Sequence, residues 1–164
     1  MALRLKLPPA LLTKRSRRLA ALAPEIDWPG NVWVGVSVER ADVLYRVDDL
    51  RELSGPAVRF LSLEPLLGAL DDLKLAGIDW VIVGGESGPS ARPMKAEWVR
   101  PIRDLCVKEG VPFFFKQWGG HNRKQTGRVL DDHLWHQMPT NEGPEPGEIG
   151  RRAGQMALPV TAAR

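Results

Sequence analysis

The stretch GIDWVIVGGESG, residues Gly77–Gly88, decides the fold. Its apolar run Trp80–Val83 is short, and glycines follow it at once. That combination predicts a buried β-strand. A run with almost no polar alternation is typical of a strand covered on both faces, as in a parallel sheet.

Working outward from this strand, four further short segments rich in Val, Ile, Leu, Phe or Trp also predict strands. They are Leu11–Lys14, Val32–Val38, Val58–Leu63 and Pro112–Lys116. Apolar residues at helical spacing predict helices between them. These cover Ser16–Ala23, Asp42–Leu53, Leu66–Leu75 and Ala96–Glu109. The alternation predicts an α/β fold with parallel strands and right-handed crossovers, and periodicity leaves open a doubly wound sheet or part of a barrel.

Length and composition set the outer limits. The chain has 164 residues, 43% of them hydrophobic and 26% charged, which is typical of a globular protein. It is too short for a complete eight-unit (β/α) barrel, which needs about 200 residues or more. We therefore expect one α/β domain of about five strands with flanking helices over residues 11–137. An irregular lead would precede it at 1–10, and a flexible tail rich in Pro and Gly would follow at 138–164.

The cellular setting and partners follow from other counts. No apolar run approaches the roughly 18 residues of a membrane span, so we expect no membrane partner. The single cysteine, Cys106, excludes an internal disulfide and favours a cytoplasmic location. The net charge of +3 is concentrated in two basic clusters, Lys14–Arg18 and His121–Arg128. These clusters predict either a nucleic-acid partner or two solvated surface segments.

Polar residues end all five predicted strands. Because ligands bind at the carboxyl ends of parallel strands, we expect these residues to form one shared site. The alternative for each glutamate is a helix N-cap or a surface charge. The candidate residues are Lys14, Arg15, Ser37, Glu39, Ser62, Glu64, Gly84, Gly85, Glu86, Ser87, Lys116 and Gln117, with Arg92 as a further cation.

The segment Gly84–Gly88 is the sharpest local feature of the sequence. Its paired glycines permit close approach of the backbone to a ligand, and Glu86 could accept hydrogen bonds from an amino group or from ribose hydroxyls. The alternative is a tight strand-to-helix turn. Cys106 lies on the apolar stripe of a helix and is interpreted as a core residue. His133 and His136 lie near two aspartates, but the segment is interpreted as an exposed turn and helix, and no metal site is predicted.

Several long motifs, in order, resemble a widespread family of phage and bacterial proteins of unknown function that looks like a radical-SAM barrel. The resemblance spans residues 11–139. The motifs are Leu12–Arg15, NVWVGVSVE (Asn31–Glu39), RFLSLEPLLG (Arg59–Gly68), GIDWVIVGGESGPSARPM (Gly77–Met94), VPFFFKQWGG (Val111–Gly120) and GRVLDDHLWHQMP (Gly127–Pro139).

The resemblance implies a cofactor chemistry that this chain does not carry alone. Members of the family have an N-terminal CxxxCxxC motif, whose thiolates would hold a [4Fe–4S] cluster that reduces S-adenosylmethionine. This sequence lacks that motif. The resemblance therefore implies a partial (β/α) barrel of about five parallel strands over residues 11–137, which would be the C-terminal part of the complete barrel and inactive alone. Its strand-end residues would face the S-adenosylmethionine and substrate cavity.

Two alternatives remain open at this point. The chain could be half of a split radical enzyme, completed by a partner chain that supplies the missing N-terminal barrel units. It could instead be a nucleic-acid-binding phage accessory protein. Whether the chain is itself an enzyme is not decided by the sequence.

Overall fold

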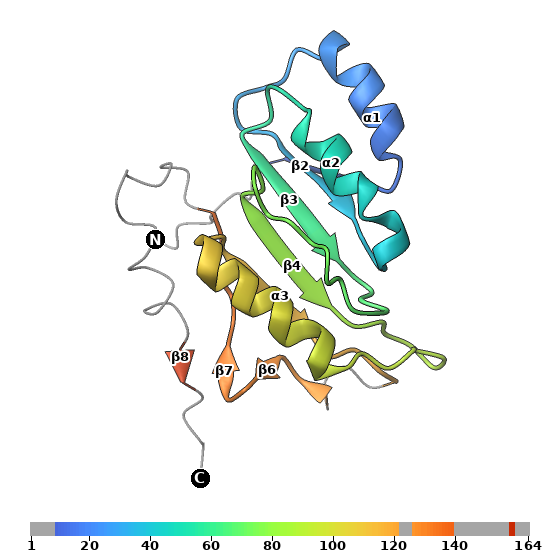
Figure 1. The fold of residues 1–164 in the computed structure, drawn as a ribbon, viewed down its shortest axis with the longest axis vertical. Coiled ribbons are helices and arrows are strands. Elements are labelled where there is room, and N and C mark those ends of the chain that lie inside the picture. The colour runs from blue at the N-terminus through green and yellow to red at the C-terminus, as the bar shows by residue number, and fades with distance from the viewer. Residues whose placement is uncertain (1–8, 122–125, 140–157, 160–164) are drawn as a thin grey trace, which may run out of the picture.

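The computed structural model describes residues 9–121, 126–139 and 158–159. Its centre is a five-stranded parallel sheet with the strand order β1-β2-β3-β4-β5 (Figure 1). The strands are β1 (Ala10–Thr13), β2 (Trp33–Ser37), β3 (Val58–Leu63), β4 (Trp80–Gly84) and β5 (Phe113–Gln117). All five predicted strands are confirmed, with ends that differ by a single residue at most.

Three α-helices connect the strands. They are α1 (Ser16–Leu22), α2 (Tyr45–Arg51) and α3 (Ala96–Glu109), with short 3-10 turns η1 (Ala23–Glu25) and η2 (Ala41–Val43). The helix predicted at Asp42–Leu53 is thus divided between η2 and α2. Gly110 ends α3 as predicted, because its φ of +70° is a left-handed conformation that glycine adopts without strain.

The prediction of a helix at Leu66–Leu75 is wrong. The segment is a loop in which four of the five leucines are nevertheless buried. Its first two amides are bound to strand ends, because the N–H of Leu66 donates to the carbonyl of Gly84 at 2.9 Å and that of Leu67 to the carbonyl of Glu39 at 3.0 Å. The leucine spacing favours a helix only weakly, and Gly68 interrupts it. Hydrogen bonds to the strand ends and the burial of the leucines therefore determine the loop conformation.

The two faces of the sheet have different coverings. Alternate residues such as Val36, Leu61 and Val83 point to one face and pack with residues of all three helices in a single core. The opposite face carries Trp33 and Trp80 in a separate aromatic cluster, and no described helix belongs to it. A doubly wound sheet has helices on both faces. Helices on one face and a strand order that follows the chain are instead typical of a (β/α) barrel segment.

The aromatic cluster lies toward the amino ends of the strands. The ring of Trp80 lies 5.7 Å from that of Trp33 and 6.0 Å from that of Phe114, both in edge-on geometry. The indole N–H of Trp80 donates to the carbonyl of Gln137 at 2.8 Å. Apolar rings therefore fill this end of the helix-free face and leave its other end to polar residues.

The two edges of the sheet also differ. At β5 the chain returns along the edge, where the N–H of Phe115 donates to the carbonyl of Trp135 at 2.9 Å and the N–H of Gln137 donates to the carbonyl of Phe113 at 3.2 Å. At β1, no strand in the described part of the chain pairs on the outer side. Leu11 and Leu12 of β1 are 42% and 50% exposed.

A second, small antiparallel sheet was not predicted. Its strands are β6 (Val129–Leu130), β7 (His133–Leu134) and β8 (Leu158–Pro159). β8 falls within the predicted flexible tail, most of which lies outside the described residues. Among the residues that the structure describes, no helix is long and apolar enough to cross a membrane.

A substitution at Gly35 would test how tightly the helix-free face is packed. A Cβ at this position would lie 2.5 Å from the buried ring of Phe60. We expect Gly35→Ala to lower the free energy of unfolding by about 1–3 kcal/mol, as overpacked cores do. Gly68→Ala is the matched control, because nothing lies within 4 Å of its added carbon. Urea denaturation measures both, and equal stabilities of the two variants would contradict the packing.

Candidate functional site

The polar strand-end residues form a line that we call the rim. On β2, β3 and β5, neighbouring residues such as Val36, Leu63 and Phe115 enter the helix-side core, so alternation places the side chains of Ser37, Ser62 and Lys116 on the helix-free face. The rim is therefore at the carboxyl ends, beyond the aromatic cluster. It comprises Lys14, Ser37, Glu39, Ser62, Glu64, Gly84, Glu86, Ser87, Arg92, Lys116 and Gln117.

Glu39 is held by two cations. Lys14 forms an ion pair with one carboxylate oxygen, and Arg46 binds the other at 3.0 Å. The same arginine donates to the carbonyl of Ser37 at 2.8 Å. Burial by itself would raise the pKa of Glu39, but the hydrogen bond and charge of Lys14, helped by Arg46, hold it below its ordinary value. Glu39 is therefore a carboxylate at neutral pH.

Arg46 is a site residue that the sequence did not reveal. It belongs to α2, and its side chain is mostly buried beside Glu39. Its Nε is fully enclosed and has no hydrogen-bond partner in the described part of the chain. The available signal was an arginine seven residues after Glu39, on the helix that follows β2.

Glu64 is paired across an intervening strand. Lys116 of β5 reaches the carboxylate that follows β3, with Nζ 2.8 Å from Oε2. Gly84 of β4 lies near this pair, and a Cβ there would be 3.1 Å from Cδ of Glu64. The missing side chain of Gly84 therefore leaves room for a charge pair between strands that are not neighbours.

Glu86 is bound by Arg92 through two side-chain contacts and one backbone contact. Nε and a terminal nitrogen of Arg92 lie 2.8 and 3.0 Å from the two carboxylate oxygens, and the backbone N–H donates at 2.9 Å. The hydrogen bonds from this arginine lower the pKa of Glu86 to about 2. Both side chains remain accessible to solvent.

The glycines of GGESG bring two strand ends together. A Cβ on Gly85 would lie 1.9 Å from the carbonyl oxygen of Trp118, so the backbones after β4 and β5 touch here. The N–H of Gly120 donates to the carbonyl of Glu86 at 2.7 Å, and the side chain of Gln117 donates to Ser87 at 2.7 Å. What fills the space beside Gly85 is therefore this chain's own backbone.

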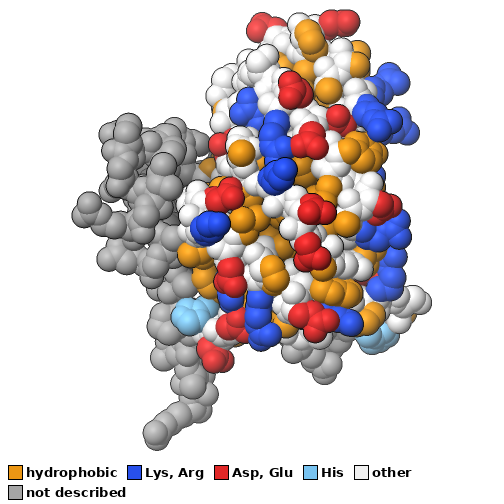
Figure 2. All heavy atoms as spheres, in the orientation of Figure 1, with side chains coloured by type: hydrophobic (Ala, Val, Ile, Leu, Met, Phe, Trp, Pro, Cys, Tyr) orange, Lys and Arg blue, Asp and Glu red, His pale blue; other side chains and the backbone are white. Residues whose placement is uncertain are grey.

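Some side chains of the two basic clusters contact other residues, and part of the second cluster lies outside the described residues. In the first cluster Lys14 binds Glu39, the guanidinium of Arg17 lies 4.7 Å from the ring centre of Tyr45, and the backbone N–H of the exposed Arg15 donates to the hydroxyl of Thr13. Much of the second cluster lies outside the described residues. Acidic and basic side chains alternate over the helical face in Figure 2. This mixture gives no support to a nucleic-acid interface on that face.

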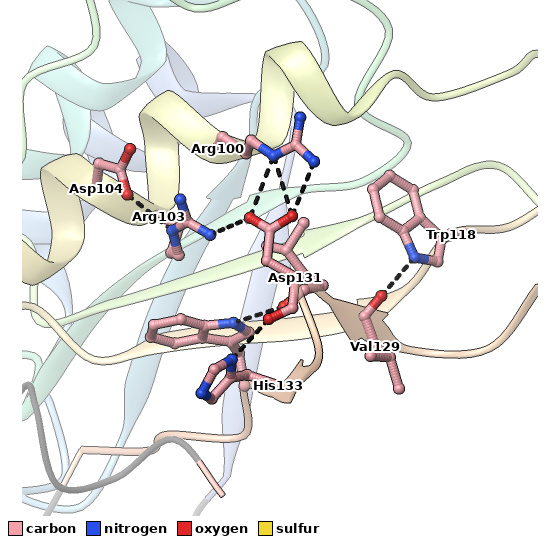
Figure 3. Close-up of polar contacts among 9 residues, drawn as sticks. Arg100, Arg103, Asp104, Trp118, Val129, Asp131 and His133 are labelled. Atoms are coloured by element: carbon pink, nitrogen blue, oxygen red, sulfur yellow. Dashed lines mark hydrogen bonds and ion pairs between the residues drawn. The ribbon is translucent and has the colours of Figure 1, made fainter. Parts of the chain in front are cut away.

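A second polar cluster, shown in Figure 3, joins α3 to the hairpin of β6 and β7. The carboxylate of Asp131 accepts hydrogen bonds from Arg100 at 2.8 Å and from Arg103 at 2.6 Å. Asp131 and Asp132 both have left-handed φ angles, as a two-residue hairpin turn requires. From the sequence, Asp131 and Asp132 were noted only as neighbours of the two histidines. The arginines three residues apart on α3 were the missed signal.

The histidines do not share that carboxylate. Nδ1 of His133 lies 2.6 Å from the backbone carbonyl of Asp131, and Nδ1 of His136 lies 3.3 Å from that of Leu134. Within the described ranges no three His, Cys, Asp or Glu side chains are grouped as a metal would require.

Comparison with known proteins gives one match. The profile of a family described as "Protein of unknown function (DUF5131)" matches residues 4–139, which include the whole parallel sheet and every rim residue. No curated protein and no solved structure matches the chain. The description assigns no activity, so a functional conclusion depends on the site itself.

Asp131 makes folding stability depend on acid pH. Hydrogen bonds from Arg100 and Arg103 lower its pKa from the ordinary 3.8 to about 2. Its contribution is therefore present above about pH 4 and is lost as the pH falls through 2. We expect Asp131→Asn to flatten the dependence of the free energy of unfolding on pH in this window, measured by urea denaturation. Asp132→Asn, in the same turn, should keep the wild-type dependence.

Cys106 should be chemically inert in the native protein. Its side chain is fully buried in the helix-side core, and burial raises the pKa of the thiol. We expect no reaction with dithiobis(nitrobenzoate) under native conditions and one thiol per chain after unfolding in urea. Rapid native labelling would contradict this position of α3.

Proposed function

We propose that this chain, which belongs to the DUF5131 family, is part of a radical-SAM-type barrel whose rim binds S-adenosylmethionine and a substrate. The observation that carries the proposal is the division of the helix-free face. Aromatic rings fill its amino end, and charged and hydroxyl groups occupy its carboxyl end. In (β/α) barrels the reacting molecules bind at that carboxyl end.

The rim supplies the groups that S-adenosylmethionine needs. The ligand carries an ammonium, a carboxylate and ribose hydroxyls. Carboxylates of Glu39, Glu64 and Glu86 accept from an ammonium or from hydroxyls, while Lys14 and Arg92 donate to a carboxylate. In radical enzymes, S-adenosylmethionine supplies a carbon radical once an iron–sulfur cluster has reduced it. The part of this chain is to hold and orient the bound molecules.

The described residues do not fit the iron–sulfur cluster itself. Such a cluster needs several thiolates, and the chain has one cysteine. Cys106 lies on α3 within the helix-side core, away from the helix-free face, and its raised pKa disfavours the thiolate. We therefore place the cluster ligands in other barrel units and assign no step of the reaction to this cysteine.

The free edge of β1 is where those units would join. The return of the chain at Trp135–Gln137 already occupies the β5 edge, whereas β1 has no described partner on its outer side and exposes Leu11 and Leu12. A parallel strand added there would extend the rim beyond Lys14. We propose that the remaining βα units pair with β1, whether they belong to the same polypeptide or to a second one.

Titration calorimetry with S-adenosylhomocysteine, an unreactive analogue, tests the proposal. We expect saturable binding to the full chain and at least about tenfold weaker binding to Glu86→Gln, because a hydrogen bond to a charged group is lost. The exposed ion pair contributes little to stability, so this variant should remain folded. Glu109→Gln is the control. This residue is the last of α3, at the end of the helix that leads into β5 and away from the rim, and the variant should bind as wild type. Absence of binding, or equal binding by all three proteins, would contradict the proposed function.

A further inference from the structure

Two serine hydroxyls at the base of the rim have no hydrogen-bond partner in the part of the chain that the structure describes. Ser37 and Ser62 are opposite each other in the register of β2 and β3, and each is only 6% exposed. Among the described residues neither side chain makes a hydrogen bond. Neither hydroxyl oxygen is among the fully enclosed polar atoms without a partner, so both oxygens retain contact with the surroundings of the sheet. Two adjacent hydroxyls that are free of partners within the described chain and reachable from outside can both donate to one bound group.

The charges above these hydroxyls are unequal. Glu39 and Glu64 follow the serines by two residues and so continue on the same face. Their partners are Lys14 and Arg46 for the first and Lys116 for the second. Three cations less two carboxylates leave one net positive charge.

The two lysines also have unused donors. An ammonium group has three N–H donors, and each of these lysines has one carboxylate partner. Their side chains are 60% and 49% exposed, so each ammonium can contact an incoming group without leaving its glutamate. Hydroxyl and ammonium donors around a net positive charge favour an oxyanion over a neutral ligand.

We propose that Ser37 and Ser62 form a subsite for an oxyanion group of the substrate, a phosphate or a carboxylate, with Lys14 and Lys116 as flanking cations. The inference rests on the proposed function because it takes the rim as the binding site, and it adds the chemical class of the substrate. The hydroxyls donate to the oxyanion from below, and the lysines neutralise it from the rim.

Amide chemical shifts of the full chain, titrated with inorganic phosphate and separately with acetate, test this subsite. Sodium chloride at equal ionic strength is the reference, since screening alone moves some shifts. We expect saturable changes at residues 37–39 and 62–64, and the tighter of the two anions identifies the group. The double variant Ser37→Ala/Ser62→Ala should bind at least about tenfold more weakly. Ser54→Ala, exposed before the amino end of β3, should bind as wild type.

The double variant also reports on stability. Removing two unpaired hydroxyls should leave the free energy of unfolding equal or higher, whereas serines with a purely structural role would lose stability. If the double variant does not fold, the subsite is tested by the wild-type titration and by the single variants Ser37→Ala and Ser62→Ala. Unchanged affinity in the variants, or shifts confined to exposed arginines, would overturn the subsite. If S-adenosylhomocysteine binds and neither anion binds, this inference alone is overturned. If neither S-adenosylhomocysteine nor an anion binds, the proposed function is overturned as well.

Discussion

The two-residue alternation of parallel strands is the constraint on which this molecule depends. In β2 it sends Val34 and Val36 to the helices and Trp33, Gly35 and Ser37 to the other face. The same alternation holds in β3 and β4, where the three strands pair in register. A slip of one residue in any strand would place its hydroxyl or charged groups in the apolar core. Fold and rim are therefore fixed by the same pairing.

Small residues make the crowded parts of this arrangement possible. Gly35 leaves the space that the ring of Phe60 fills, and Gly84 leaves room beside Glu64 for the bond to Lys116. Gly85 permits contact between the backbones that follow β4 and β5. The glycines thus serve packing within the chain, and the groups that remain available to a ligand are the partly exposed ion pairs and the two serine hydroxyls.

The ion pairs of the rim reconcile burial with charge. A carboxylate partly withdrawn from water needs a partner, and Glu39 and Glu64 have cations from other elements, whereas the more exposed Glu86 pairs with Arg92 of the same loop. The partners lie just after β1, on α2, on β5 and in the loop after β4, so several elements meet at one edge. The Asp131 cluster has a different task, because it fastens α3 to the β6–β7 hairpin at the covered side of the sheet.

Local sequence determined the five strands, the parallel α/β class and the strand-end position of the polar residues. Short apolar runs that end in Gly, Ser or Glu encode these features within a few residues. Only the tertiary structure decided the rest. The loop at Leu66–Leu75, the pairing of Lys116 with Glu64, and the choice of a barrel segment over a doubly wound sheet arise between residues far apart in the chain. Their energies come from hydrogen bonds and packing across elements, which no local pattern records.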